Sequence, residues 1–360
     1  MKKQQLLNIC IAAALAAIFA SCKSSTAPEQ SNLIPLSVRD TISIASGDRA
    51  LFIVNEGSYP TANASLDVIV FHAASSVVDT LVHVPELSGM GGGNDILVSG
   101  NKLLLVDNGS NLVDVGSVTP LQSMSGIPVG LDAPNKMALI GANLLLVTRR
   151  LATSAAIIDL TTNTITDSIP LGGVSVAVAV LNNKAYITTG ASEYSGPYHL
   201  NVVDLSTRQV TKTFNLPLSG EQALPDSSSG NIIIGMSGDG TTTSSKLYFI
   251  NATSDVITDS LTPGTPADDP ELTTGSKHFI VMGTNVYPLA VPTHQLPAPI
   301  VRGTVAYYKG MYDATSDALY LGNAGDFTNP GSMDVYSAST GKLLWSHPAG
   351  IAPGHFAFYH

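Results

Sequence analysis

Short apolar runs, each followed by a polar, glycine-rich segment, recur along the chain from residue 51 onward. The runs are LFIVNEGS, LLLVDNGS, LLLVTRRL, KAYITTGA, NIIIGMSG, KHFIVMGT and ALYLGNAG, beginning at Leu51, Leu103, Leu144, Lys184, Asn231, Lys277 and Ala318. Their starts are 52, 41, 40, 47, 46 and 41 residues apart, and no helical periodicity follows residue 22. Each run predicts a strand that leads into a loop, at the same place in a repeated unit.

A second pattern follows most of these runs: a strand ending in Asp or Asn, a turn and a further strand. It is clearest in AAIIDLTTNTITDSIPLG, LNVVDLSTRQVTKTFNLPL, KLYFINATSDVITDSLTPG and MDVYSASTGKLLWSHPAG, from Ala155, Leu200, Lys246 and Met333. Several strands in each unit of about 40 residues are typical of a β-propeller, whose blades have four strands. The pattern therefore predicts an all-β, seven-bladed β-propeller over residues 36–360.

The chain ends in PGHFAFYH, a turn and an aromatic strand with no partner after it. An unpaired apolar strand is an aggregation hazard, so we expect it to pair with the N-terminal part of the propeller. The N- and C-terminal strands would then share one blade, with the last strand innermost.

Composition agrees with this fold: 44% of the residues are hydrophobic and 12% charged, with 32 Gly and 21 Pro. That mixture supplies a large core together with many turns.

The first residues predict a targeting segment. MKK precedes the short apolar stretch LLNICIAAALAAIFA, and small residues precede Cys22. This arrangement resembles a bacterial lipobox, which implies a signal peptide over residues 1–21 and lipidation at Cys22; an ordinary secretory signal with an incidental cysteine is the alternative. The apolar stretch is short for a membrane span. Residues 22–35 are polar and predict a flexible tether.

Cysteine content and charge exclude several classes of site. The only cysteines are Cys10 and Cys22, so the predicted propeller has no disulfide, cysteine-bound metal or cysteine nucleophile. The formal net charge is −10; residues 1–21 hold two of the 17 basic residues and no acid, so the remainder carries −12. Nucleic acid and anionic lipid headgroups are poor partners for so acidic a chain.

Motifs for catalysis are absent from the sequence. There is no G-x-S-x-G elbow, and the eight histidines are scattered without an H-E-x-x-H pair. The acidic run PADDPE supplies Asp268, Asp269 and Glu271, which are either oxygen ligands for Ca²⁺ or a solvated turn. Glycines in SGMGGGND, from Ser88, precede a strand and not a helix, so they predict a loop between blades and no phosphate site. We therefore expect no catalytic residue, no resident metal or cofactor, and no enzyme activity.

The loops after the seven runs should converge on one face of the propeller, and they combine amides, acids and aromatic rings suited to recognition. Many of the Asn and Asp residues have the simpler role of forming turns. The two arginines of LLLVTRRL are either a ligand clamp or are solvated or paired with nearby acids. The candidate ligand-binding residues are Asn55, Glu56, Tyr59, Asn63, Asp107, Asn108, Asn111, Arg149, Arg150, Tyr194, Tyr198, Asp239, Tyr287, Asn323, Asp326 and Phe327, with Glu193 beside them.

The predicted propeller resembles a known family in several motifs. These are NEG at Asn55, NASL at Asn63, GNDI at Gly93, LLLVDNGSN at Leu103, NPG at Asn329 and the final PGHFAF. They are similar to the YncE-like, or YVTN-repeat, seven-bladed propellers, and more narrowly to DUF5074 lipoproteins of Bacteroidetes-type bacteria. The segment APNKMALIG, from Ala133, departs from the Pro-Arg pairing expected there.

The resemblance implies a function as well as a fold. Similar lipoproteins capture cobalamin at the cell surface above an outer-membrane transporter of the TonB-dependent type. It therefore implies a non-enzymatic protein, lipid-anchored to the outer membrane on its surface or periplasmic side, with a corrinoid as its ligand. The alternatives are a cell-envelope scaffold for protein–protein contacts and, third, a propeller enzyme of the lactonase or quinoprotein type. Against the enzyme, the chain has a single tryptophan, Trp345, whereas quinoprotein propellers repeat a Trp motif in each blade.

Overall fold

The computed structural model describes residues 36–38, 43–58, 61, 63–73, 78–81, 92–121, 124–128, 130, 132–291 and 293–360. They belong to the compact unit Leu33–His360. Their secondary structure consists of 29 strands, and no helix occurs among them. Accordingly, this part of the chain contains no helix that is long and apolar enough to cross a membrane. The predicted signal peptide, Cys22 and the tether lie outside the described residues.

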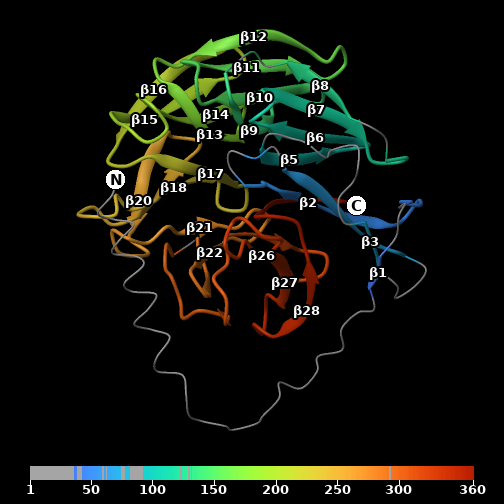
Figure 1. Ribbon diagram of the computed structural model, residues 1–360. Coiled ribbons are helices and arrows are strands. Elements are labelled where there is room, and N and C mark those ends of the chain that lie inside the picture. Colours follow the sequence, from blue (N-terminus) through green and yellow to red (C-terminus); the bar gives the residue numbers. More distant parts are fainter. Residues whose placement is uncertain are drawn as a thin grey trace. The chain divides into compact units, whose positions relative to one another are not determined.

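Seven separate sheets follow one another in a ring (Figure 1), as the repeats predicted. Six sheets have four strands, and the first has five in the order β1-β4-β3-β2-β29. The fold is therefore a seven-bladed β-propeller, and the predicted fold class is confirmed.

The strands of blades 1 to 4 are assigned as follows. Blade 1 comprises β1 Leu36–Val38, β2 Arg49–Asn55, β3 Ser65–Phe71, β4 Val78–Leu81 and β29 Pro353–Tyr359. Blade 2 comprises β5 Gly93–Ser99, β6 Lys102–Asp107, β7 Leu112–Ser117 and β8 Ser125–Pro128. Blade 3 comprises β9 Pro134–Leu139, β10 Leu144–Arg149, β11 Ser154–Asp159 and β12 Thr164–Pro170. Blade 4 comprises β13 Val174–Leu181, β14 Lys184–Gly190, β15 Tyr198–Asp204 and β16 Gln209–Leu216.

The remaining three blades complete the ring. Blade 5 comprises β17 Gly220–Asp226, β18 Asn231–Met236, β19 Lys246–Asn251 and β20 Val256–Leu261. Blade 6 comprises β21 Glu271–Leu272, β22 Phe279–Met282, β23 Asn285–Pro288 and β24 Val301–Arg302. Blade 7 comprises β25 Lys309–Asp313, β26 Ala318–Asn323, β27 Ser332–Ser337 and β28 Leu343–Pro348.

The C-terminal strand closes the ring. β29 pairs antiparallel with β2, with Ala50 opposite Tyr359 and Ile53 opposite Phe356. Strands from the two ends of the propeller thus share blade 1, and β29 is its innermost strand, as predicted. One addition was not predicted: β1 pairs parallel with β4 on the outer side of the same blade.

Seven hydrophobic clusters make up the core, each holding residues from two neighbouring blades. In β2, Phe52 and Val54 belong to the cluster shared with blade 2, whereas Leu51 and Ile53 belong to the cluster shared with blade 7. Successive side chains of a strand point to opposite faces, so a blade covered on both sides needs apolar residues at every position. This explains why LFIV and LLLV show no polar alternation.

All seven innermost strands begin at one face of the ring, where the second strand of each blade ends. For example, Gly93 of β5 pairs with Asp107 of β6, and Pro134 of β9 pairs with Arg149 of β10. We call this side, formed by the connections after the second strands and before the innermost strands, the loop face. The convergence predicted for the seven loops is therefore present.

Candidate functional site

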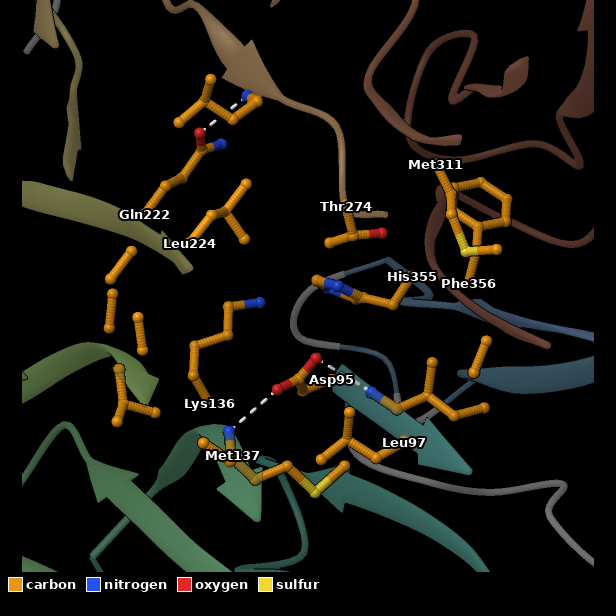
Figure 2. Close-up of a pocket in the computed structure, with 18 of the residues that line it drawn as sticks. Asp95, Leu97, Lys136, Met137, Gln222, Leu224, Thr274, Met311, His355 and Phe356 are labelled. Carbon is orange, nitrogen blue, oxygen red and sulfur yellow. Dashed lines mark hydrogen bonds between the residues drawn. The ribbon is translucent and has the colours of Figure 1, made fainter. Parts of the chain in front are cut away.

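A channel of about 540 Å³ runs between the innermost strands of all seven blades (Figure 2). Its lining comes from β5, β9, β13, β17, β21, β25 and β29. Because no single blade forms it, the channel exists only in the closed ring.

The channel is lined by ionisable side chains at the loop face and by apolar side chains further in. Six ionisable lining residues lie within the first three positions of their strands, and we call them the channel mouth. They are Asp95, Lys136, Glu221, Glu271, Lys309 and His355. Further along the innermost strands the lining includes Leu97, Ala138, Val180 and Leu224. A ligand entering from the loop face would meet charge first and hydrocarbon afterwards.

Glu56, directly after β2, is bound at the edge of the mouth. Its Oε1 lies 3.0 Å from Nε2 of His355, and its Oε2 accepts a 2.9 Å hydrogen bond from the Tyr308 hydroxyl. Burial acts to raise the pKa of Glu56, but the hydrogen bond with His355 and the charges of His355, Lys309 and Lys136 lower it to about 2. Burial, together with the charge of Lys136, lowers the pKa of His355. Glu56 therefore keeps its negative charge at neutral pH.

Glu221 and Glu271 form an acidic wall of the mouth with Asp269. Glu271 is ion-paired through Oε1 with Lys309, and its Oε2 is buried without a hydrogen-bond partner. Ser237 Oγ lies 3.3 Å from Glu221 Oε2 and closer to Asp269, so its single proton is shared between the two acids. Burial, and then the charges of Asp269 and Glu271, raises the pKa of Glu221 to about 7.

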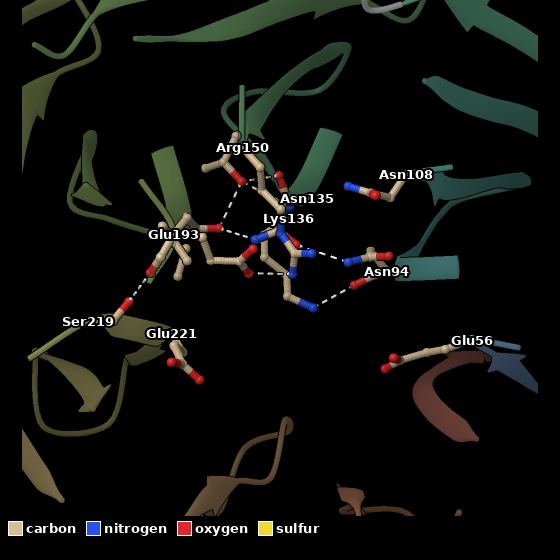
Figure 3. Close-up of polar contacts among 12 residues, drawn as sticks. Glu56, Asn94, Asn108, Asn135, Lys136, Arg150, Glu193, Ser219 and Glu221 are labelled. Atoms are coloured by element: carbon tan, nitrogen blue, oxygen red, sulfur yellow. Dashed lines mark hydrogen bonds and ion pairs between the residues drawn. The ribbon is translucent and has the colours of Figure 1, made fainter. Parts of the chain in front are cut away.

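Lys136 faces the same opening from another wall (Figure 3). Its Nζ donates to the carbonyl oxygen of Asn94, and it makes no ion pair with any carboxylate among the described residues. Burial lowers its pKa, while the charge of Asp95 acts to raise it. Amide side chains support this wall: Asn94 Nδ2 donates to Asn135 Oδ1 at 3.1 Å, and Asn135 Nδ2 donates to the carbonyl oxygen of Val176 at 2.7 Å.

Two predicted ligand-binding residues lie beneath the loop face. Asn55 and Asp107, the last residues of β2 and β6, are 0% and 2% exposed. Asn55 Nδ2 donates to Ser65 Oγ, and Asp107 Oδ1 accepts from the backbone N–H of Ser110. Their burial suits a role in holding the loop ends and leaves them no surface for a ligand.

Tyr59 lies outside the described residues. The expectation that Tyr287 lies in a converging loop is wrong: it is in β23, opposite Ile280, because Met282 pairs with Asn285 across a two-residue turn. Tyr198 is likewise the first residue of a strand, β15, although it begins at the loop face.

Several other predicted residues shape the loops in which they lie. Asn63 Oδ1 accepts the Ser58 N–H at 2.7 Å, Asn111 Oδ1 accepts the Ala133 N–H at 3.0 Å, and Asn323 Oδ1 accepts the Gly325 N–H at 2.9 Å. Asn108 Nδ2 donates to the carbonyl oxygen of Pro134 at 2.8 Å. These are the turn-forming roles common to Asn and Asp.

Asp239 and Asp326 act in the same way. The N–H groups of residues 241–243 donate to Asp239, and those of residues 328 and 329 donate to Asp326. These hydrogen bonds hold the pKa of both carboxyl groups well below the usual range. Both aspartates therefore carry their charge permanently, on the outside of their loops.

The two adjacent arginines pair with acids. Arg149 is ion-paired with Asp132 at 2.5 Å, and its Nε donates to the carbonyl oxygen of Ser154. Arg150 is ion-paired with Glu193 at 2.7 Å (Figure 3), while its Nε is buried without a partner. Of the two interpretations of these arginines, pairing with nearby acids is the one that the structure shows.

Exposed apolar side chains also lie in loops of this face. Tyr194 is 75% exposed and Phe327 is 47% exposed; Leu151, which the sequence analysis missed, is 71% exposed. Phe327 has a φ of 60°, a conformation that is strained for a bulky residue and is found at sites where surrounding structure enforces it. Its ring meets that of Tyr308 edge to face at 5.1 Å.

The acidic run PADDPE does not gather into one site. Asp268 accepts the Thr265 N–H, Asp269 accepts from Ser237, and Glu271 is in β21, paired with Lys309. No group of three or more potential metal ligands occurs in the described part of the chain. The run is neither a calcium cluster nor wholly a solvated turn, because Glu271 is buried.

The channel mouth was not predicted from the sequence, although a short signal for it exists. In GND at Gly93, PNK at Pro134 and PGH at Pro353, a glycine or proline opens the innermost strand and an ionisable residue stands third. These motifs are far apart in the chain, and only the ring brings them around one axis.

Comparison with known proteins supports the architecture. No family model matches the chain, and neither does any curated protein. Among solved structures, hydrazine synthase of Kuenenia stuttgartiensis is similar with a TM-score of 0.60 and 12% identity, over 74% of this chain and 90% of that chain. The computationally designed protein Ika8 is similar with a TM-score of 0.51 and 12% identity, over 73% of this chain and 89% of that chain. At this identity the likeness establishes the fold alone.

Proposed function

We propose that this protein is a non-enzymatic, membrane-anchored propeller that binds a ligand on its loop face. The observation that carries the proposal is Phe327, a strained, half-exposed ring on the loop face that contacts Tyr308 at the edge of the channel mouth. Exposed apolar side chains on adaptable loops beside buried ionisable groups are typical of binding sites.

The finer proposal names a corrinoid as the ligand, passed on to an outer-membrane transporter of the TonB-dependent type. It rests on the resemblance to YncE-like lipoproteins of the DUF5074 type, and the chemistry of the loop face is compatible with it. Tyr194 and Phe327 offer ring faces and edges to a flat macrocycle, and the loops carry groups that can hydrogen-bond peripheral carboxamides. Lipidation at Cys22 would place the protein at the outer membrane.

Gel filtration of the purified full chain with cyanocobalamin tests this proposal, because the red chromophore reports co-elution directly. Isothermal titration calorimetry would then compare the Tyr194→Ala and Phe327→Ala variants with the parent protein. Ile165→Ala is a matched control, since Ile165 is 41% exposed on the outer strand β12, away from the loop face. We expect weaker binding by the first two variants only. Absence of co-elution and of any heat of binding would remove the corrinoid.

A protein–protein scaffold in the cell envelope is the second candidate, favoured by Leu151. An aliphatic side chain that is 71% exposed suits an apolar protein contact better than a polar small molecule. Crosslinking in intact cells through a photoreactive amino acid at position 151 would separate the two. A discrete protein adduct in the absence of corrinoid binding would favour the scaffold.

A further inference from the structure

The channel joins an acidic wall at its mouth to an apolar interior. We propose that the channel is a binding site of its own for an organic ammonium ion, with the amine at Glu221 and Glu271 and the apolar body in the channel. The proposal does not depend on which ligand occupies the loop face.

The charge balance of the mouth and its edge favours a cation. Carboxylates outnumber basic side chains there: Glu56, Asp95, Glu221, Asp269 and Glu271 against Lys136 and Lys309. The excess negative charge lies around Glu221. Its strongest charged neighbours are Asp269 and Glu271, and Lys309 is a weaker one. For Lys136, by contrast, the strongest charged neighbour is the oppositely charged Asp95, although burial has the larger effect and lowers its pKa.

The unpaired carboxylate oxygen of Glu271 also favours an ammonium ligand. Glu271 is 8% exposed, lines the channel, and has its Oε2 buried without a hydrogen-bond partner. The one hydrogen bond that Glu221 accepts in the described part of the chain comes from Ser237, whose single proton it shares with Asp269. Buried carboxylate oxygens are costly to leave unpaired, and an ammonium group supplies three donors together with a compensating charge.

The channel interior suits an apolar body behind the amine. Leu97, Ala138, Val180 and Leu224 contribute to its lining (Figure 2 labels two of these, Leu97 and Leu224). The volume of about 540 Å³ lies within the range of about 300–1,000 Å³ common for small-molecule sites. On β13 the lining is Ala177, Val178, Ala179 and Val180, so one wall has only small side chains.

Titration calorimetry with three probes of equal chain length tests the proposal on the full chain. We expect n-hexylammonium to bind at pH 8 and low salt, and 1-hexanol and hexanoate to bind at least tenfold more weakly. Glu221→Gln should weaken hexylammonium binding tenfold or more, whereas Glu221→Asp, which keeps the charge, should retain part of it. Asp167→Asn removes an equal charge from the outer strand β12 and should change nothing. Circular dichroism of each variant verifies folding.

The pH dependence provides a second readout. Glu221 has a pKa of about 7, and it faces Ser237, Asp269, Glu271 and Lys309, with Lys136 across the mouth. An alkylammonium stays protonated throughout, so binding should follow ionisation of Glu221 and be about tenfold weaker at pH 6 than at pH 8. Three outcomes would overturn the proposal: hexanol binding as tightly as hexylammonium, hexanoate binding more tightly, or an unchanged affinity in folded Glu221→Gln. The cyanocobalamin experiment is independent of all three.

Discussion

Phe356 provides the sharpest test of how the ring is held closed. It is 7% exposed, lies opposite Ile53 in the β2–β29 pair, and belongs to the cluster between blades 7 and 1. Phe356→Ala leaves a cavity in that cluster, which costs about 3–5 kcal/mol for a buried phenylalanine. With about 2.1 cal/mol/K of unfolding entropy per residue, residues 36–360 have about 0.7 kcal/mol/K, so a loss of about 4 kcal/mol lowers Tm by about 6 °C.

Differential scanning calorimetry measures this shift, and Phe327→Ala is the matched control. The control removes the same side chain from a residue that is 47% exposed on the loop face, so about 1 kcal/mol and a Tm change below about 2 °C are expected. If the two variants lowered Tm equally, the packing of β29 would not hold the ring closed, and our account of blade 1 would be refuted.

Three further predictions follow from blade 1 and from buried carboxyl groups. Ending the chain after Gly354 removes most of β29, and we expect an unfolded, protease-sensitive product; a soluble, equally heat-stable one would contradict the closure. Burial and the charge of Asp107 raise the pKa of Asp114 to about 6 from 3.8, because the folded protein disfavours the ionised carboxyl group. The stability of the folded protein is therefore about 3 kcal/mol higher below pH 3.8, and this difference is lost as pH rises through 6. Asp114→Asn should therefore raise Tm at pH 7.5 and leave it nearly unchanged at pH 4. Glu56 has the opposite sign: its pKa falls from 4.5 to about 2, so about 3 kcal/mol of stability present above pH 4.5 is lost as pH falls towards 2. Denaturant melts of Glu56→Gln should lack this loss, and a parallel loss in the variant would exclude Glu56 as its source.

The sequence predicts this fold well because burial on both faces of a blade leaves a plain signal. LFIV and LLLV are apolar at every position since neighbouring blades cover both sides, and the turns between them are rich in Gly, Asn and Asp. The strand β1 gives no such signal because it is three residues long. In blade 6, β21 and β24 have two residues each, too few for any periodic pattern.

The site is harder to predict because its residues come together only through the ring. Lys136 and Glu221 are single charged residues at the starts of separate strands, and nothing local in the sequence relates them. The sequence also does not show which candidate residues are buried. Asn55 and Asn63 belong to the same motif, yet only Asn55 is fully buried. Tyr287 was misplaced because blade 6 connects β22 to β23 by a two-residue turn, which is shorter than the repeat pattern suggested.

The shortness of blade 6 has a consequence for motion. Its strands of two, four, four and two residues share fewer backbone hydrogen bonds than those of its neighbours. Local unfolding of this blade should therefore need less free energy, and its amide hydrogens should exchange with solvent faster. Glu271, at the start of β21, belongs to this blade. The unpaired carboxylate oxygen of Glu271 therefore lies in the blade with the shortest strands, whose amides should be among the first of the propeller to exchange with solvent.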